Sequence, residues 1–281
     1  MIYYPKIYGT CFGALRAIKL AYTLKDKYKD KNIYIFKELL HNQYIIDALN
    51  KDNIKTIDNI DNLTNDDIII IRAHGETKSM FEELDKKGIT YYDATCTNVS
   101  KIHNMVEEKY HEGYKIIIIG KKEHPEVIGT NGWCDNTGII IEDENDYKLL
   151  NKKDNYYVVC QTTISSKKVD NVIEYLDQNG FNYTFNNTIC NQQDLIQKSS
   201  MELAKDMDIM FVIGGKNSSN TKELFNKCSS VCKETYFFSE LSDFKEFIKD
   251  KKYSPKTKIG FTGGASTMKE QIFEFAKLLE K

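Results

Sequence analysis

The sequence predicts an α/β protein made of several small lobes with parallel sheets. Short aliphatic runs, such as Ile68-Ile69-Ile70-Ile71, alternate with longer amphipathic segments along the chain. Continuous apolar strands between helices are typical of parallel sheets that are covered on both faces. Cys11, Cys96 and Cys190 each follow a strand-like run, precede a helix-like segment and are separated by 85 and 94 residues. We therefore expect three lobes, one for each cysteine.

The expected elements follow from these patterns. Strands are expected at residues 33–36, 67–71, 90–93, 115–119, 138–142, 156–160, 181–185, 209–213, 235–238 and 258–261. Helices are expected at residues 13–28, 98–111, 166–178, 193–206, 220–228 and 268–279. Boundaries near Cys96 and Cys190 give predicted domains of residues 12–96, 97–189 and 190–281, the last completed by residues 1–11.

Composition excludes some classes of function. The net charge of −2 lacks the basic excess that nucleic-acid-binding proteins usually carry. The aliphatic runs are long enough for a strand but too short for a membrane span, and the apolar stretch near residue 1 is too short for a signal peptide. We expect a cytoplasmic monomer that binds neither nucleic acid nor a membrane.

Seven cysteines in such a chain indicate metal binding, catalysis or core packing rather than disulfides. Thiolates suit iron–sulfur clusters, and three separated cysteines could hold three irons of a 4Fe-4S cube, leaving the fourth iron for a substrate. Burial as small apolar residues is an equally good interpretation of the spacing alone. Of the other four cysteines, Cys228 and Cys232 have the spacing of a ligand pair but are not expected to bind metal. Cys134 and Cys160 are interpreted as structural residues.

Polar clusters follow the predicted strands, where open α/β sheets bind ligands. Three histidines in these clusters, His41, His74 and His124, could bind a phosphate through ring and backbone donors, although a lone loop histidine is more often only solvated. His103 and His111 are expected on a helix surface. The alternation of strand and polar cluster thus predicts an anion site.

Hydroxyl and carboxyl groups complete the candidate site. The cluster Asn217-Ser218-Ser219-Asn220-Thr221 suits a diphosphate or, equally, a helix N-cap, and Gly263-Gly264-Ala265-Ser266 is similar. Neither is a nucleotide-binding glycine loop, so we expect no nucleotide cofactor. Glu126 could donate a proton if burial raises its pKa; the alternative is a solvated Glu at a helix start.

Nine short segments, taken in order, resemble the 4-hydroxy-3-methylbut-2-enyl diphosphate reductase family over nearly the whole chain. The segments are Gly9-Thr10-Cys11-Phe12-Gly13, His41-Asn42, Ala73-His74-Gly75, Asp93-Ala94-Thr95-Cys96, His124-Pro125-Glu126, Gln161-Thr162-Thr163, Thr188-Ile189-Cys190-Asn191, Asn217-Ser218-Ser219-Asn220 and Gly264-Ala265-Ser266. Each is short, and their order makes the resemblance specific.

The resemblance implies a pseudo-threefold trefoil of three α/β lobes around a central 4Fe-4S cluster held by Cys11, Cys96 and Cys190. The implied reaction is the reductive dehydroxylation of (E)-4-hydroxy-3-methylbut-2-enyl diphosphate to isopentenyl and dimethylallyl diphosphate, the last step of the methylerythritol phosphate (non-mevalonate) pathway. The substrate hydroxyl would bind the open iron, Glu126 and Thr162 would deliver protons, and ferredoxin or flavodoxin would supply electrons. The implied diphosphate ligands are His41, His74, His124, Thr163, Ser218, Ser219, Asn220 and Ser266.

The chain departs from the family pattern at several positions. Thr97 stands where the family usually has Pro, Thr10 where it has Phe, and Glu76 where an apolar residue is common. After Cys190 the usual residues are replaced in the region of Gln192, Gln193, Ile196 and Gln197. These changes leave the implied cluster ligands and proton donor in place.

Two other functions fit the same residues. A dehydratase like quinolinate synthase would also use three cysteines and an open iron, but its carboxylate substrate favours arginine near the site, and Arg16 and Arg72 are the only arginines in the sequence. A phosphate-binding module with merely buried cysteines would hold no iron. Iron content and turnover of the hydroxylated diphosphate distinguish the three.

Overall fold

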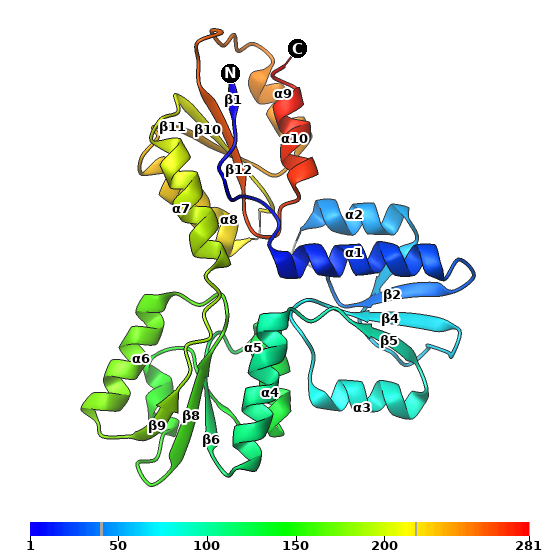
Figure 1. Ribbon diagram of the computed structural model, residues 1–281, viewed down its shortest axis with the longest axis vertical. Coiled ribbons are helices and arrows are strands. Elements are labelled where there is room, and N and C mark those ends of the chain that lie inside the picture. The colour runs from blue at the N-terminus through cyan, green and yellow to red at the C-terminus, as the bar shows by residue number, and fades with distance from the viewer. Residues whose placement is uncertain (40–41, 217, 281) are drawn as a thin grey trace. The chain divides into compact units, whose positions relative to one another are not determined.

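The computed structural model of the protein describes residues 1–39, 42–216 and 218–280, without the side chain of Ser219. Within these residues the chain forms three four-stranded sheets in which every strand pair is parallel (Figure 1). This confirms the predicted class, an α/β protein with several small parallel sheets. No helix in the described part of the chain is long and apolar enough to cross a membrane.

The chain divides into two compact units. The smaller unit comprises Met1–Leu15, Leu40–Asn53 and Asn191–Lys281, and the larger comprises Arg16–Leu39 and Ile54–Cys190. Helix α1 (Phe12–Lys27) begins in the smaller unit and continues into the larger. The predicted lobe boundaries near Cys96 and Cys190 stay a prediction.

The first sheet of the larger unit has the order β3-β2-β4-β5. Its strands are β2 (Asn32–Phe36), β3 (Ile54–Ile57), β4 (Asp67–Ile71) and β5 (Thr90–Asp93). All residues of β4 are buried, as its unbroken apolar run predicts for an inner strand. Helix α3 (Lys78–Lys87) is capped by Thr77 and packs Leu84 into the core on one face of this sheet.

The second sheet of the larger unit has the order β7-β6-β8-β9. Its strands are β6 (Lys115–Ile119), β7 (Ile139–Ile141), β8 (Asn155–Cys160) and β9 (Asn182–Phe185). Helix α6 (Ser166–Gln178) covers one face, while α4 (Thr97–His111) and α5 (Pro125–Asn131) cover the other. Two 3-10 helices, η1 (Gly132–Cys134) and η2 (Glu144–Leu149), lie on its connections.

The third sheet belongs to the smaller unit and has the order β1-β12-β10-β11. Its strands are β1 (Ile2–Tyr3), β10 (Ile209–Ile213), β11 (Glu234–Phe238) and β12 (Ile259–Gly263). Helices α9 (Leu241–Ile248) and α10 (Lys269–Lys277) cover one face, and α7 (Gln192–Ala204) and α8 (Ser219–Ser229) the other. Helix α2 (Gln43–Lys51) is grouped with this unit by its contacts.

The three sheets share one topology. Each has two inner strands that lie side by side. We call the one that comes first in the chain the leading inner strand (β2, β6 or β10) and the later one the trailing inner strand (β4, β8 or β12). The edge strand next to the trailing inner strand is β5, β9 or β1, respectively. In the third sheet this position is filled by β1, which pairs Ile2 with Ile259. The two inner strands form the switch point at which open α/β sheets bind ligands.

Strands β1 and β3 were not among the expected elements. Strand β1 is only two residues long, and β3 carries the exposed Lys55 and Thr56 between two isoleucines. Neither has the apolar run that marks a buried strand, because both lie at sheet edges.

Candidate functional site

The three predicted ligand cysteines occupy equivalent positions. Each follows the edge strand beside a trailing inner strand, and its backbone N–H donates to the carbonyl two residues beyond the trailing strand. The bonds run from Cys11 to Ala265 (2.9 Å), from Cys96 to Ala73 (2.9 Å) and from Cys190 to Thr162 (2.8 Å). One local backbone arrangement therefore holds all three thiols.

Exposure separates these three cysteines from the other four. Cys11, Cys96 and Cys190 are half-buried, whereas Cys134, Cys160, Cys228 and Cys232 are buried. Burial raises the pKa of Cys134 to about 11 and that of Cys228 to about 12, so both remain thiols near neutrality. Because clusters are held by thiolates, the half-buried set fits an iron–sulfur cluster in ligand type and accessibility. Among the described residues, no three or more His, Cys, Asp or Glu side chains lie close enough to hold a single metal ion.

The predicted diphosphate ligands also fall at equivalent positions. Three of them, His41, His124 and Ser218, stand five residues beyond a leading inner strand. Three others, His74, Thr163 and Ser266, stand three residues beyond a trailing inner strand. These are the ends of the strands at each switch point, where ligands bind. His41 and the side chain of Ser219 lie outside the part of the chain that the structure describes.

His124 is the N-cap residue of α5, and its ring is held by the helix start. The Nδ1 atom accepts the backbone N–H of Glu126 at 3.2 Å, so the neutral ring carries its proton on Nε2. The ring of His74 lies edge-on to that of His124, with centroids 5.7 Å apart. The two histidines, which follow strands of the first and second sheets, are therefore brought together.

Glu126 and Thr162 are joined by two hydrogen bonds. The backbone N–H of Thr162 donates to Oε1 of Glu126 at 2.5 Å, and the Thr162 hydroxyl lies 2.7 Å from Oε2. Glu126 is 3% exposed, and burial raises the pKa of its carboxyl group to about 7, against the lowering effect of the Thr162 bonds. The interpretation of Glu126 as a solvated residue is therefore wrong. Oε1 is occupied by an obligate donor, so a proton on Glu126 resides on Oε2, facing the hydroxyl.

This carboxyl–hydroxyl pair occurs in one sheet only. The positions equivalent to Glu126, seven residues beyond the other leading strands, are Gln43 and Asn220. The positions equivalent to Thr162 are Ala73 and Ala265. The second sheet alone therefore provides an acid together with a hydroxyl at these positions.

Gln161 orients the exposed Thr163. Its Oε1 accepts the backbone N–H of Lys121 at 3.1 Å, and its Nε2 donates to the Thr163 hydroxyl oxygen at 2.8 Å. Because that oxygen accepts from Gln161, the Thr163 hydroxyl hydrogen remains available to donate to an anion. Gln161 is 5% exposed, and it contributes to the site by orienting Thr163.

In the smaller unit, Ser218 caps a helix and is a predicted hydrogen-bond donor to the diphosphate. Its Oγ accepts from the backbone N–H (3.3 Å) and hydroxyl (3.0 Å) of Thr221 at the start of α8. Both bonds use the oxygen as acceptor, which leaves the Ser218 hydrogen to donate outward. Asn220 lies in the first turn of this helix, and its carbonyl accepts from Gln193 at 3.1 Å.

Ser266 is linked to the segment that follows His41. The carbonyl of Ser266 accepts from Asn42 Nδ2 at 2.8 Å, and the same Nδ2 lies 3.3 Å from Oε1 of Gln271. Asn42 is 3% exposed and caps α2 by accepting the backbone N–H of Tyr44 at 3.0 Å. The buried amide of Asn42 thus places two predicted binding segments of the smaller unit side by side.

His103 contradicts its predicted surface position. It is 3% exposed and stacks on Trp133, with ring centroids 5.1 Å apart. Burial lowers the pKa of His103 to about 4. A Cβ atom on Gly75, whose φ is +76°, would lie 2.5 Å from the His103 ring. The glycine after His74 is required by this close approach, whereas His111 is exposed as predicted.

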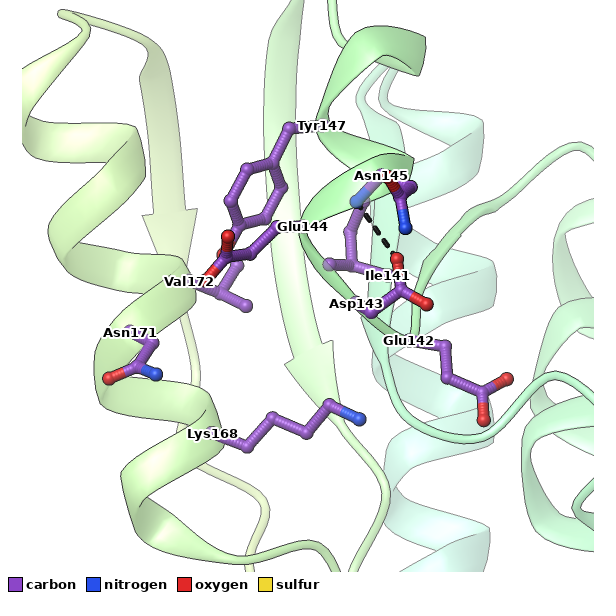
Figure 2. A pocket seen from close by; sticks show the side chains of 9 residues that line it. All are labelled: Ile141, Glu142, Asp143, Glu144, Asn145, Tyr147, Lys168, Asn171 and Val172. Atoms are coloured by element: carbon purple, nitrogen blue, oxygen red, sulfur yellow. Dashed lines mark hydrogen bonds between the residues drawn. The ribbon is translucent and has the colours of Figure 1, made fainter.

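Two surface recesses lie in the larger unit. One is lined by His124 together with Lys121, Lys122, Glu123, Pro125 and Glu142. The other lies between the end of β7, η2 and α6 and carries Asp143, Glu144 and Lys168 (Figure 2). None of the predicted site residues is among the described residues that line the second recess, so only the first belongs to the candidate site.

The chain is similar to known proteins over nearly its whole length. A family model described as LytB protein matches residues 2–280. The chain belongs to the LytB family. A curated relative from Thermoanaerobacter sp. (strain X514) is 40% identical over 262 residues, which are 92% of this chain and 89% of the relative. One from Clostridioides difficile (strain 630) is 38% identical over 275 residues, 97% and 96% of the two chains. Both relatives are named 4-hydroxy-3-methylbut-2-enyl diphosphate reductase, which confirms the resemblance seen in the sequence.

Solved structures show the same fold. A structure of (E)-4-hydroxy-3-methyl-but-2-enyl diphosphate reductase, described as the terminal enzyme of the non-mevalonate pathway, aligns with a TM-score of 0.80 and 31% identity. It covers 99% of this chain and 98% of its own. The corresponding reductase from Plasmodium falciparum aligns with a TM-score of 0.82 and 27% identity, over 100% and 88% of the two chains.

Glu76, which was predicted to depart from the family pattern, has an ion-pair partner in this chain. Its Oε1 lies 2.7 Å from Nη2 of Arg72, and both side chains are buried. The indole N–H of Trp133 donates to the Glu76 carbonyl at 3.1 Å. Arg72 and Glu76 flank His74 in the sequence, so the ion pair closes the loop that carries this histidine. Sequence reasoning missed the pair, although the i, i+4 spacing was visible.

The other residues that were predicted to depart from the family pattern also make local contacts or lie at the surface. Thr10 donates to the carbonyl of Thr267 at 2.9 Å, and Thr97 is the exposed first residue of α4. Ile196 is buried, and the buried Gln197 accepts from Lys227. The fold thus accommodates these residues, and the three cysteines keep their equivalent positions.

Proposed function

We propose that the chain reduces (E)-4-hydroxy-3-methylbut-2-enyl diphosphate to isopentenyl and dimethylallyl diphosphate, the last step of the methylerythritol phosphate pathway. Two electrons and two protons enter, and one water molecule leaves with the hydroxyl oxygen. Membership of the LytB family supports the reaction class. The observation that carries the proposal is the buried Glu126, bonded to Thr162 at a switch point, which gives this chain a proton donor.

We propose that Cys11, Cys96 and Cys190 hold a 4Fe-4S cluster. Their shared backbone arrangement and their accessibility support this set over the four buried cysteines. When bound, such a cluster supplies electrons to the substrate, and ferredoxin or flavodoxin is the proposed source of those electrons. The assignment rests on equivalent positions and on ligand type.

Glu126 and Thr162 are proposed to deliver the proton that leaves with the hydroxyl group. Near neutrality a carboxyl group with a pKa of about 7 is partly protonated and can still release its proton. The proton on Oε2 passes to the Thr162 oxygen as the Thr162 hydroxyl gives its own proton to the substrate. The backbone bond to Oε1 keeps the carboxyl group oriented during the transfer.

Neutral donors are proposed to bind the diphosphate. His124, whose ring is held by the start of α5, is one proposed ligand, and Thr163 and Ser218 present hydroxyl hydrogens that their internal hydrogen bonds do not use. His41, His74, Ser219, Asn220 and Ser266 complete the proposed set. Hydrogen bonds to a charged group are worth about 1.5–3 kcal/mol each, so several are enough to hold a diphosphate without many cations.

The dehydratase alternative is disfavoured by the arginines. Arg16 donates to the carbonyls of Thr95 (2.6 Å) and Asp93 (3.3 Å), and Arg72 is paired with Glu76. Both guanidinium groups are engaged within the protein. Each guanidinium group is held by acceptors of the protein itself, and neither arginine is among the predicted substrate ligands.

Anaerobic turnover tests the proposal. Protein purified without oxygen should contain about four irons per chain and, with dithionite and a mediator dye, convert the hydroxylated diphosphate to both five-carbon products. Mass spectrometry of the products and iron analysis are the measurements. An iron-loaded protein that consumes no substrate would contradict the reaction, and an iron-free protein would contradict the cluster.

A further inference from the structure

Asn98 donates a hydrogen bond to one of the proposed cluster ligands. Its Nδ2 lies 3.4 Å from Sγ of Cys190, within the range of an N–H···S bond. Asn98 is the second residue of α4, two residues after Cys96, and its side chain is exposed. The amide is therefore directed at the sulfur of a ligand that comes from another part of the larger unit.

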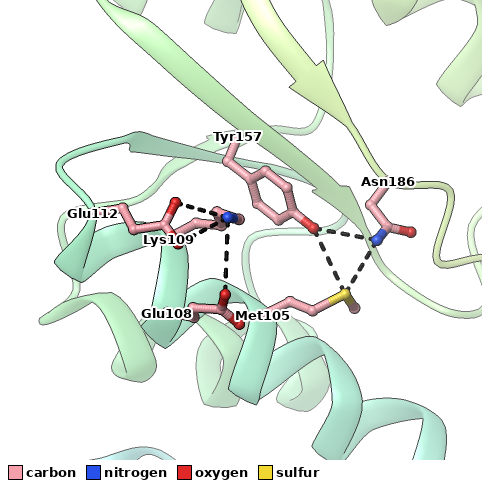
Figure 3. A network of polar contacts seen from close by, with 6 residues as sticks. All are labelled: Met105, Glu108, Lys109, Glu112, Tyr157 and Asn186. Carbon is pink, nitrogen blue, oxygen red and sulfur yellow. Dashed lines mark hydrogen bonds and ion pairs between the residues drawn. The ribbon is translucent and has the colours of Figure 1, made fainter.

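The segment that carries Cys190 is held against α4 at a second place. Asn186 Nδ2 lies 3.1 Å from Sδ of Met105 in α4 and 3.2 Å from the hydroxyl of Tyr157 in β8 (Figure 3). The backbone N–H of Cys190 is itself bonded to the Thr162 carbonyl. The contacts of Asn186 and of Cys190 hold this segment in place. They therefore keep the Cys190 sulfur within reach of Asn98.

A hydrogen-bond donor that points at a ligand sulfur changes the reduction potential, because it interacts with the negative charge of the cluster. Reduction adds one negative charge, part of which is carried by the thiolate sulfurs. An N–H dipole that points at sulfur stabilises the reduced form more than the oxidised form, and hydrogen bonds to the sulfurs are known to set cluster potentials. The effect requires a donor hydrogen. Asn has one, whereas Asp and Leu have side chains of similar shape but no such hydrogen.

We propose that Asn98 is a positioning residue that raises the reduction potential of the cluster through its hydrogen bond to Cys190. The inference rests on the proposed function, because it requires Cys190 to be a ligand. It assigns to Asn98 a role in electron uptake, distinct from binding of the substrate.

Redox titration of three variants tests this role. Asn98→Leu removes the donor, Asn98→Asp keeps the side-chain shape but removes the donor and adds charge, and Asn104→Leu is the control. Asn104 is an exposed residue of the same helix. Each iron-loaded protein is titrated anaerobically with dithionite, one electron per cluster, and followed by visible absorbance. Iron content is measured in parallel.

We expect the ratio of reduced to oxidised cluster at a fixed potential to fall roughly three- to tenfold in Asn98→Leu. For a one-electron couple, tenfold corresponds to about 59 mV. Asn98→Asp should shift at least as far, and Asn104→Leu should match the wild type. An unchanged midpoint in either iron-loaded Asn98 variant, or an equal shift in Asn104→Leu, would overturn the inference. A wild-type protein without iron would instead overturn the proposed function.

Discussion

Glu126 is the residue whose surroundings say most about the chemistry. Its carboxyl group is buried, has a pKa of about 7 and shares a hydrogen bond with Thr162. Glu126→Gln keeps the size of the side chain but removes the transferable proton. We expect kcat to fall at least about a hundredfold, with less effect on KM and with full iron content. Steady-state kinetics and iron analysis check this, and near-normal turnover in the iron-loaded variant would exclude Glu126 as the acid.

The pH dependence of stability should reveal two opposed titrations. The pKa of His103 is lowered to about 4, so the unfolded chain binds more protons and this residue makes stability fall as pH drops from about 6.5 to 4. The pKa of Glu126 is raised to about 7, so this residue makes stability fall as pH rises from about 4.5 to 7. Between pH 4.5 and 6.5 the two effects partly cancel in the wild type.

Removing Glu126 should expose the contribution of His103. In Glu126→Gln the free energy of unfolding should rise with pH between 4.5 and 6.5, by up to about 1.4 kcal/mol per pH unit. In His103→Phe it should instead fall over the same range. Urea unfolding can be followed by the fluorescence of Trp133, which stacks on His103. A His103→Phe protein whose stability still rises with pH would contradict the assignment.

Ser218 should affect substrate binding as well as stability, because it caps α8 and can donate to the diphosphate. We expect Ser218→Ala to weaken substrate binding roughly ten- to a hundredfold. Thr77→Ala is the matched control, since Thr77 caps α3 but is not a proposed ligand. It should lose about 1 kcal/mol of stability and no affinity. Equal affinity in the two variants, measured by calorimetry, would remove Ser218 from the site.

At the scale of elements, the loop after β4 depends on the buried ion pair. Glu76→Leu leaves Arg72 buried without its partner, which should destabilise the protein by about 3–5 kcal/mol. The double variant Arg72→Leu/Glu76→Leu leaves no uncompensated charge and should recover much of this loss. Urea unfolding of the single and double variants gives the coupling. A double variant as unstable as the sum of both singles would show that the two residues act independently.

At the scale of the whole molecule, one strand order is used three times, and each use places one half-buried cysteine after the same edge strand. We expect Cys96→Ser to lose iron and activity, because a proposed ligand is removed. Cys228→Ser is the control, since Cys228 is buried in α8 and should not bind iron. Iron analysis after anaerobic reconstitution decides the matter. Full iron content in Cys96→Ser would contradict the ligand set.

The class of fold and the family could both be recognised from the amino-acid sequence. Strands buried on both faces require continuous apolar runs, so segments such as Asp67–Ile71 and Lys115–Ile119 could be recognised locally. The motifs around the cysteines and histidines were recognisable because they are short and ordered along the chain. Both signals depend only on neighbouring residues.

The contacts of individual side chains could not be predicted, because they depend on segments that are far apart in the sequence. Strand β1 completes the third sheet by pairing with β12, more than 250 residues away, and nothing in its two residues predicts this. Glu126 is buried because it meets Thr162 across adjacent strand ends, and His103 because Gly75 and Trp133 enclose it. Burial sets the pKa values of Glu126 and His103, and burial is a sum over distant neighbours that local periodicity does not contain.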